Sequence, residues 1–427
     1  MKAALRLFAI AVVFGIASAA WLILGALTSG RSSSQSHELR SKVVDLWGQP
    51  QAQAGPAITF VWLTDKTITK TETPAGGQPR EVQERVREEH RKDVSFASTH
   101  VDAALHLDQR RKGLAWYSLY DVDLHGAWSY EHEEAEAGTL HVRFAFPDPQ
   151  GVYDGFRFTI DGQPKELRPA NGAIETDVPV SPGQVVALTV AYKSRGLDEW
   201  RYVPDPGVAA LRDFHLTLAT DFTDVDFPPN TLSPSQKKET ASGVELHWDF
   251  ERVVTGHAVG MTMPKRLQPG ELAAHLSFSA PISLLFFFLI LLVLGRLRGL
   301  DIHPVNYLFL AAAFFAFHLL FAYTADRLPL EAAFALSSAV SVLLVVSYLR
   351  LVVSPRFALV EAGLSQLVYL VGFSLAHFWE GYTGLTVTVL SIATLFLLMQ
   401  LTGRIRWSGL GASRASSGPA TPAIAQT

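Results

Sequence analysis

The chain has 427 residues, of which 48% are hydrophobic and 18% are charged, and it contains no cysteine. The missing cysteines exclude structural disulfides, thiolate metal sites and thiol nucleophiles, so a metal would need histidine and carboxylate ligands. Residues 28–275 carry 26 basic residues (36 less 10 elsewhere) and 35 acidic ones (40 less 5), a net charge of −9. An acidic region of this kind argues against nucleic acid as a partner.

The N-terminus carries Lys2 and Arg6, followed by an apolar run over residues 7–27. This run is long enough to cross a bilayer as a helix. A cleaved signal peptide is the alternative, and Ser18-Ala19-Ala20 resembles a cleavage site, but the apolar run continues past it. We therefore predict a cytoplasmic segment over 1–6, an uncleaved anchor helix over 7–27, and a serine-rich exit over 30–36.

The central region, residues 28–275, reads as an exported domain made of strands. A short helix is expected over 36–46, and strands follow wherever apolar and polar residues alternate or β-branched residues gather. The expected strands are 58–62, 140–146, 156–160, 185–192, 214–219 and 244–250. Asp161-Gly162 and Asn171-Gly172 signal tight turns. The charged run 80–92 fits either a helix or an edge strand. The pattern favours an antiparallel, sandwich-like domain or a related all-β fold.

Five apolar runs separated by short polar breaks fill residues 276–402. Their number and length favour a bundle of transmembrane helices over buried helices of a soluble protein. The expected spans are about 278–295, 305–323, 328–349, 357–378 and 385–402. Residues 403–427 are rich in Gly, Ser, Ala and Pro, which is typical of a disordered tail.

Basic residues in the short loops predict the orientation of the spans. Lys2 and Arg6 place the N-terminus inside, and basic residues recur at every second loop and at the C-terminus, namely Arg296, Arg298, Arg350, Arg356, Arg404, Arg406 and Arg414. The pattern predicts six spans with both termini inside and residues 28–275 outside.

The segment 302–308 reads Ile-His-Pro-Val-Asn-Tyr-Leu, and the segment 402–407 combines basic residues with a tryptophan. Both resemble elements of the CreD family of bacterial inner-membrane proteins: the first is similar to that family's entry into the third span, and the second to its closing basic-plus-Trp element. Leu46-Trp47-Gly48, Gly55-Pro56 and 194–198 also resemble family elements. The resemblance implies a multi-pass inner-membrane protein with a periplasmic domain that supports envelope integrity under stress. It assigns no activity, and it leaves the roles of His303, Pro304 and Tyr307 unknown.

Residues that could bind a metal or catalyse a reaction in the water-exposed region form no recognisable motif. A metal site could draw on a cluster in the central region, but that cluster lacks the usual ligand spacing and fits a solvated edge or turn; its members are His125, Glu131, His132, Glu133 and Glu134. Other histidines are scattered without a visible partner: His90, His100, His106 and His141. No nucleophile elbow or phosphate-binding loop is present. We expect no enzymatic activity, no metal and no cofactor.

Polar residues near the outer ends of the spans form a candidate outer-rim cluster, made up of His318, Asp326, Arg327, Glu331, His377 and Glu380. They could form a polar pocket or a docking surface that responds to pH through its histidines. They could equally be interfacial side chains that reach water, as Glu361 could at the inner side. Small residues four apart, Ser337 with Ser341 and Gly372 with Ala376, are expected to pack helices closely.

Three functions fit this sequence. The first is a non-enzymatic envelope-integrity protein whose partners are the lipid bilayer and an envelope component or protein. A transporter or channel is the second, but the span centres are almost wholly apolar apart from Ser and Thr, and no repeat is visible. The third is an envelope-stress sensor, which would need a partner because the inner loops are short.

Overall fold

The structure is a computed structural model, and it describes residues 2–72, 80–112, 115–166, 168–204, 211–379 and 381–403. The chain divides into a helical unit, Met1–Gln35 with Leu267–Thr427, and a β unit, Ser36–Arg266. Six apolar helices and a sandwich-like β region confirm the predicted fold class. The predicted tail, from residue 404 onward, lies outside the described residues.

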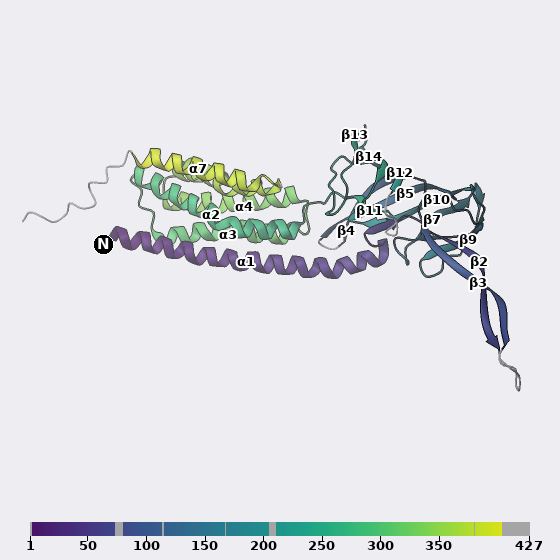
Figure 1. The fold of residues 1–427 in the computed structure, drawn as a ribbon. Helices are drawn as coiled ribbons and strands as arrows, with labels where there is room; N and C mark the ends of the chain where they lie inside the picture. Colours follow the sequence, from purple (N-terminus) through teal and green to yellow (C-terminus); the bar gives the residue numbers. More distant parts are fainter. Residues whose placement is uncertain are drawn as a thin grey trace, which may run out of the picture. The chain divides into compact units, whose positions relative to one another are not determined.

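The first helix, α1, is a single helix over Lys2–Trp47 that passes from the helical unit into the β unit (Figure 1). Residues 30–36, predicted as a serine-rich exit from the first span, therefore continue the helix. Serine costs a helix only a few tenths of a kcal/mol, and no proline occurs before Pro50 to stop it. The helix ends where Gly48 adopts φ +101° and donates its N–H to the Val44 carbonyl at 2.9 Å.

The helical unit continues with α2 (Pro269–Leu297), α3 (Pro304–Thr324) and α4 (Leu330–Val352) and ends with α7 (Thr383–Thr402). Between α4 and α7 lies an irregular span built from short pieces: η1 (Phe357–Ala362), α5 (Gly363–Gln366), η2 (Leu367–Gly372), α6 (Phe373–Leu375) and η3 (Ala376–Phe378). The segments η1 and η2 are π-helical. Six helices of the described chain are long and apolar enough to cross a membrane.

The core of the helical unit is aromatic. Trp21 of α1 is fully buried and packs its ring against Phe315 at a centroid distance of 5.8 Å, while Phe287 of α2 packs against Phe314 of α3 at 4.5 Å. Ion pairs join α1 to the bundle near both ends of its apolar run. One links Arg6 to Asp301, with Nη2 2.9 Å from Oδ2, and the other links Arg31 to Asp326. The anchor helix is thus an integral part of the bundle.

The β unit holds three sheets. The eight-stranded sheet has the order β13 (Gln236–Glu239), β14 (Val244–Val253), β12 (Leu211–Thr220), β4 (Ser98–Lys112), β5 (Ala115–Glu131), β10 (Val185–Leu197), β7 (Asp154–Ile160), β8 (Gln163–Pro164). The four-stranded sheet has the order β3 (Arg80–Val94), β2 (Ala57–Glu72), β6 (Gly138–Ala145), β9 (Ala173–Val180). The three-stranded sheet has the order β1 (Gln51–Ala54), β11 (Glu199–Val203), β15 (Val259–Thr262).

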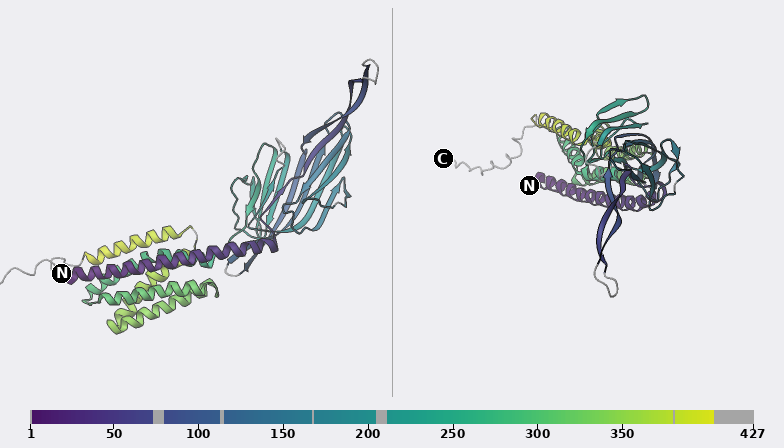
Figure 2. Two further views of the ribbon diagram at one scale, coloured as in Figure 1. Left: turned by 90° about the horizontal axis from the view of Figure 1, so that it is seen from below. Right: turned by 45° about the vertical axis from the view of Figure 1, so that its right-hand side comes forward.

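Two strand pairs depart from the expected antiparallel arrangement, because β4 pairs with β12 and β1 pairs with β11 in parallel. The undecided charged run 80–92 forms strand β3, which pairs antiparallel with β2 along the projecting hairpin seen in Figure 2. Two long paired strands, β4 and β5, were not among the expected strands, although their exposed and buried residues alternate.

One hydrophobic core joins the three sheets. Large, fully buried side chains from several strands fill it, among them Phe60 of β2, Trp248 of β14 and Trp200 of β11. Each residue of the eight-stranded sheet therefore points either into this core or away from it. The outward-pointing residues are largely polar, and they carry the candidate sites of this unit.

Candidate functional site

The described residues of the predicted outer-rim cluster have different surroundings within the helical unit. His318 is 3% exposed, and its Nδ1 donates to the Phe314 carbonyl at 3.0 Å while its ring meets Trp21 and Phe317 edge-on. His377 is half-buried, and its Nδ1 donates to the Phe373 carbonyl at 3.3 Å. Both histidines are thus bonded to their own helices.

The acidic member of that cluster has a partner that sequence reasoning missed. Asp326, only 8% exposed, pairs with Arg31 of α1, whose guanidinium also lies 5.7 Å from the ring centroid of Tyr323. Arg327 and Glu331 are exposed, and Glu380 lies outside the described residues. The arrangement ties α1 to the connection between α3 and α4.

The motif residues of the third span have structural roles at the start of α3. His303 is the N-cap, and its Nδ1 accepts a hydrogen bond from the Val305 N–H at 3.3 Å, while Pro304 occupies the first helical position. Tyr307 is 2% exposed and packs edge-on against Phe288 of α2 at 5.0 Å. These contacts fix where the helix begins and how it meets α2.

A polar group at mid-span corrects the expectation that only Ser and Thr interrupt the apolar centres. Gln366 is fully buried between η1 and η2, and its Nε2 donates to the Ser341 hydroxyl at 2.9 Å. Ser341 in turn donates to the Ala313 carbonyl at 2.7 Å. Among the described residues, Gln366 Oε1 has no hydrogen-bond partner. The sequence shows this glutamine plainly, at the centre of the span predicted over 357–378.

π-Helical turns on either side of Gln366 alter the backbone bonding of this span. The hydroxyl of Ser283, on α2, donates to the carbonyl of Tyr369 in η2. The hydroxyl of Tyr369 accepts a hydrogen bond from Thr394 of α7 at 2.9 Å. A polar layer therefore connects α2, α4, α7 and the irregular span inside the helical unit.

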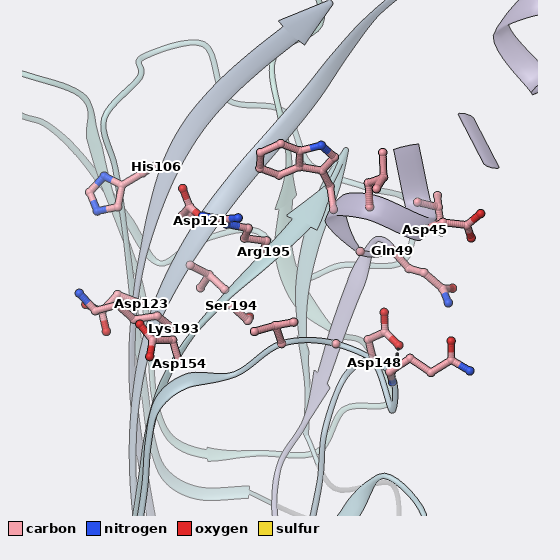
Figure 3. A pocket seen from close by; sticks show the side chains of 18 residues that line it. Asp45, Gln49, His106, Asp121, Asp123, Asp148, Asp154, Lys193, Ser194 and Arg195 are labelled. Carbon is pink, nitrogen blue, oxygen red and sulfur yellow. Dashed lines mark hydrogen bonds and ion pairs between the residues drawn. The ribbon is translucent and has the colours of Figure 1, made fainter. Parts of the chain in front are cut away.

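In the β unit, the end of α1 forms one wall of a groove of about 720 Å³, here called the Trp47 groove (Figure 3). Its other walls come from β5, β10 and the loop 148–154. Trp47 lies against two guanidinium groups, with Arg110 Cζ 4.2 Å and Arg195 Cζ 5.1 Å from its ring centroid. The neighbouring Gly48 must be glycine, because a Cβ there would lie 2.8 Å from the Arg195 carbonyl oxygen.

The lining of the Trp47 groove is acidic. Two of its carboxylates are neutralised by ion pairs, Asp121 with Arg195 at 3.0 Å and Asp123 with Lys193 at 3.1 Å. The lining holds five carboxylates against one lysine and one arginine, a net charge of −3; the carboxylates are Asp45, Asp121, Asp123, Asp148 and Asp154. The groove therefore suits a ligand that is positively charged or rich in hydrogen-bond donors.

The Trp47 groove lies at one end of a larger polar face on the eight-stranded sheet. This polar face consists of outward-pointing side chains on β4, β5, β10, β12 and β14, among them His100, Asp102, His106, Asp123, His125, Lys193, Asp213, His215, His247 and Asp249. A second hollow of about 370 Å³ lies farther along β4 and β5, and His100 and His125 line it.

Two histidines that are distant in sequence meet on the polar face. The rings of His100 and His215 stack with centroids 4.8 Å apart. His215 also bonds to two carboxylates, through Nδ1 to Asp249 at 2.7 Å and through Nε2 to Asp213 at 3.1 Å. The hydrogen bond with Asp249 raises the pKa of His215 above its usual value. His100, for which the sequence showed no partner, thus stacks on His215.

The histidine–glutamate cluster at 125–134 does not come together as a ligand set. His132 is buried, and both of its ring nitrogens are bonded, Nδ1 to the Tyr130 hydroxyl at 3.0 Å and Nε2 to the Glu136 carbonyl at 2.8 Å. Glu133 and Glu134 form ion pairs with Arg212 and Lys92. His125 lies on the polar face, 3.2 Å from Asp123. His132 is thus a structural residue of the core.

Comparison with known proteins finds a similarity in the C-terminal part of the helical unit. Residues 278–408 match the family model described as inner membrane protein CreD. No curated protein sequence matches the chain. A solved structure from Legionella pneumophila, described as a candidate nutrient-binding protein, is 10% identical, with a TM-score of 0.31 over 72% of this chain and 96% of that one, and this likeness supports no conclusion. The predicted resemblance is thus confirmed over residues 278–408, which are similar to the family of inner membrane protein CreD.

Proposed function

We propose that this protein supports the integrity of the cell envelope without catalysing a reaction, by binding an envelope component in the Trp47 groove. The groove carries the proposal, because it is roughly twice as large as the second hollow on the polar face and is built on the family-like segment Leu46-Trp47-Gly48. A volume of about 720 Å³ lies within the usual range for ligand sites.

The proposal requires the β unit to lie in the periplasm, with both termini in the cytoplasm. The ion pairs of α1 support this orientation. Arg6 pairs with Asp301 in the connection between α2 and α3, so the basic N-terminus and that connection lie at one end of the bundle. Arg31 pairs with Asp326 at the other end. Since basic loops stay inside, the end that carries Arg6 faces the cytoplasm and the end that continues into the β unit faces outward.

The acidic lining of the groove suggests the chemistry of the bound component. A net charge of −3 around an open groove favours an amine-bearing or otherwise cationic group over phosphate or carboxylate. Trp47 and the loop around Val152, whose side chain is 81% exposed, provide apolar contact beside these charges. A peptide or glycan with free amines has this combination of features.

Gene deletion with complementation tests the function. We expect loss of the gene to increase susceptibility to detergents and envelope-active antibiotics, and the wild-type gene to restore resistance. The double variant Trp47→Ala, Asp154→Asn alters the groove wall and should fail to restore it. The matched control is Glu239→Ala, an exposed change on edge strand β13, which should complement fully.

The outcomes separate the function from the site. An unchanged susceptibility after deletion contradicts the envelope role. Full complementation by the groove variant, at normal membrane levels of the protein, contradicts the groove as its site. A photoreactive residue at Val152 should crosslink in intact cells to a product that is absent when the residue is placed at Glu239.

A further inference from the structure

Three adjacent strands of the β unit bring histidine and carboxylate side chains together on the polar face. The parallel pairing of β4 with β12 sets His100 directly beside His215, and the antiparallel pairing of β12 with β14 sets Asp249 opposite His215. Asp213 precedes His215 by two residues, so its side chain lies on the same side of the strand. Four side chains from three strands, two histidines and two aspartates, are thus neighbours on the polar face.

Ligand atoms of this group are close enough to share one ion. One nitrogen or oxygen from each of His100, Asp213 and His215 lies within 4.8 Å of the others. Ligands at about 2.0–2.2 Å from a zinc ion are separated by less than this, so the side chains rotate from their stacked arrangement when they close around an ion. In the part of the chain that the structure describes, this is the one group of three such residues.

Asp249 gives the group a feature of built metal sites. Its carboxylate holds Nδ1 of His215 at 2.7 Å, which fixes the ring and directs Nε2 toward Asp213. Metal-binding histidines commonly donate their second ring nitrogen to a carboxylate, which orients the ring and raises its basicity. Here the carboxylate is already in place, on the next strand.

We propose that His100, Asp213 and His215 bind one divalent transition-metal ion of the zinc class, with Asp249 as the residue that positions His215. Two imidazoles and one carboxylate suit zinc, copper or nickel, whereas calcium and magnesium prefer sites made of oxygen ligands. The ion takes the place of the proton shared between His215 Nε2 and the Asp213 carboxylate. Because the group is exposed to solvent, water or a ligand from the envelope completes the coordination.

Other exposed His–Asp pairs on this domain supply matched controls. His125 lies 3.2 Å from Asp123, and His106 lies 3.4 Å from Asp221, but neither belongs to a described group with a second histidine. They test whether any exposed histidine with a neighbouring carboxylate suffices. The proposal predicts that they do not contribute.

Zinc titration of the full chain tests the proposal. The protein is purified in detergent with a histidine-free affinity tag, stripped with a chelator and titrated with Zn²⁺ by calorimetry. We expect one saturable site per chain. His100→Ala and His215→Ala should abolish it, and Asp249→Asn should weaken it by about 10-fold or more. His125→Ala and His106→Ala should bind as the wild type does.

Asp213 needs a conservative change, because its backbone φ is +42° and asparagine accepts this region better than alanine. Asp213→Asn should weaken zinc binding while its unfolding temperature without metal matches the wild type. Titration with Co²⁺ should give a visible absorption band that His215→Ala loses. Absence of a saturable site in the wild type, or its survival in the His100→Ala, His215→Ala double variant, overturns the proposal. The outcome does not depend on the Trp47 groove, which shares no lining residue with this group.

Discussion

At the residue scale, the side chain that least fits its surroundings is Gln366. It lies fully buried in a span, donates one hydrogen bond to Ser341 and leaves Oε1 without a partner among the described residues. A buried unpartnered acceptor costs roughly 1–3 kcal/mol, whereas hydrogen bonds between membrane helices contribute about 0.6 kcal/mol. Packing alone would therefore favour leucine at this position.

This comparison predicts that Gln366→Leu leaves the thermal unfolding temperature of the detergent-solubilised protein unchanged or raises it. The control is Gln400→Leu on α7, where the glutamine is exposed and the change should have little effect. A lower unfolding temperature for Gln366→Leu alone would show that Oε1 has a bound partner, such as a water molecule. The same measurement on Ser341→Ala reports the hydrogen bond to Ala313 separately.

Individual residues also show which parts of the candidate sites could be predicted from the sequence and which could not. The start of α3 could be predicted, because a capping histidine followed by proline is a local signal. Pairs such as His100 with His215 or Arg31 with Asp326 could not, since they depend on which strands and helices become neighbours. The sequence suggested His132 as a candidate metal ligand, because it does not reveal that this histidine is buried beside Tyr130.

At the element scale, α1 is the feature that sequence reasoning described least well. The serine-rich stretch 30–36 suggested an exit from the helix, but α1 continues to Trp47 and delivers the tryptophan to the groove. Helix propensity favours this continuation only weakly, so the contacts at its end matter. Val43 is 2% exposed against Tyr117 and Leu197, which ties the last turns of α1 to the β unit.

A pair of glycine substitutions tests the continuity of α1. Gly30→Ala should stabilise the protein by up to about 1 kcal/mol, because alanine is the better helix former and nothing lies within 4 Å of the added methyl group. Gly48→Ala should destabilise it by about 1–2 kcal/mol or more, because φ is +101° and the methyl group meets the Arg195 carbonyl. Thermal unfolding should show opposite signs; the same sign for both would contradict a helix that runs through residue 30 and stops at 48.

Strand pairing was the other feature of the elements that could not be predicted from the sequence. Alternation of apolar and polar residues identifies a strand and its buried face, as it does for 140–146 in β6. It says nothing about which distant strand will be the neighbour, so the parallel pairing of β4 with β12 had no local signal. The charged strand β3 forms ion pairs with β2, such as Glu88 with Lys66. These contacts could not be predicted without knowing that the two strands form a hairpin.

At the scale of the whole molecule, composition and loop charge were the most informative features of the sequence, because they predicted the fold class. Apolar runs of bilayer length predicted the helices, and the acidic, turn-rich centre predicted the β domain, because both signals are spread over many residues. The match to the CreD family over 278–408 agrees with motifs found at 302–308 and 402–407. The proposed function depends on the β unit and its Trp47 groove facing the periplasm.

Single-cysteine labelling measures that orientation most directly, since the natural chain contains no cysteine to give background. Exposed positions are Asp301 in the α2–α3 connection, Arg327 in the α3–α4 connection and Val152 at the groove. With a membrane-impermeant maleimide on cells whose outer membrane is opened, Val152→Cys and Arg327→Cys should react, and Asp301→Cys should react only after the inner membrane is disrupted. Labelling of Asp301→Cys in cells with an intact inner membrane, with Val152→Cys protected, would contradict the account.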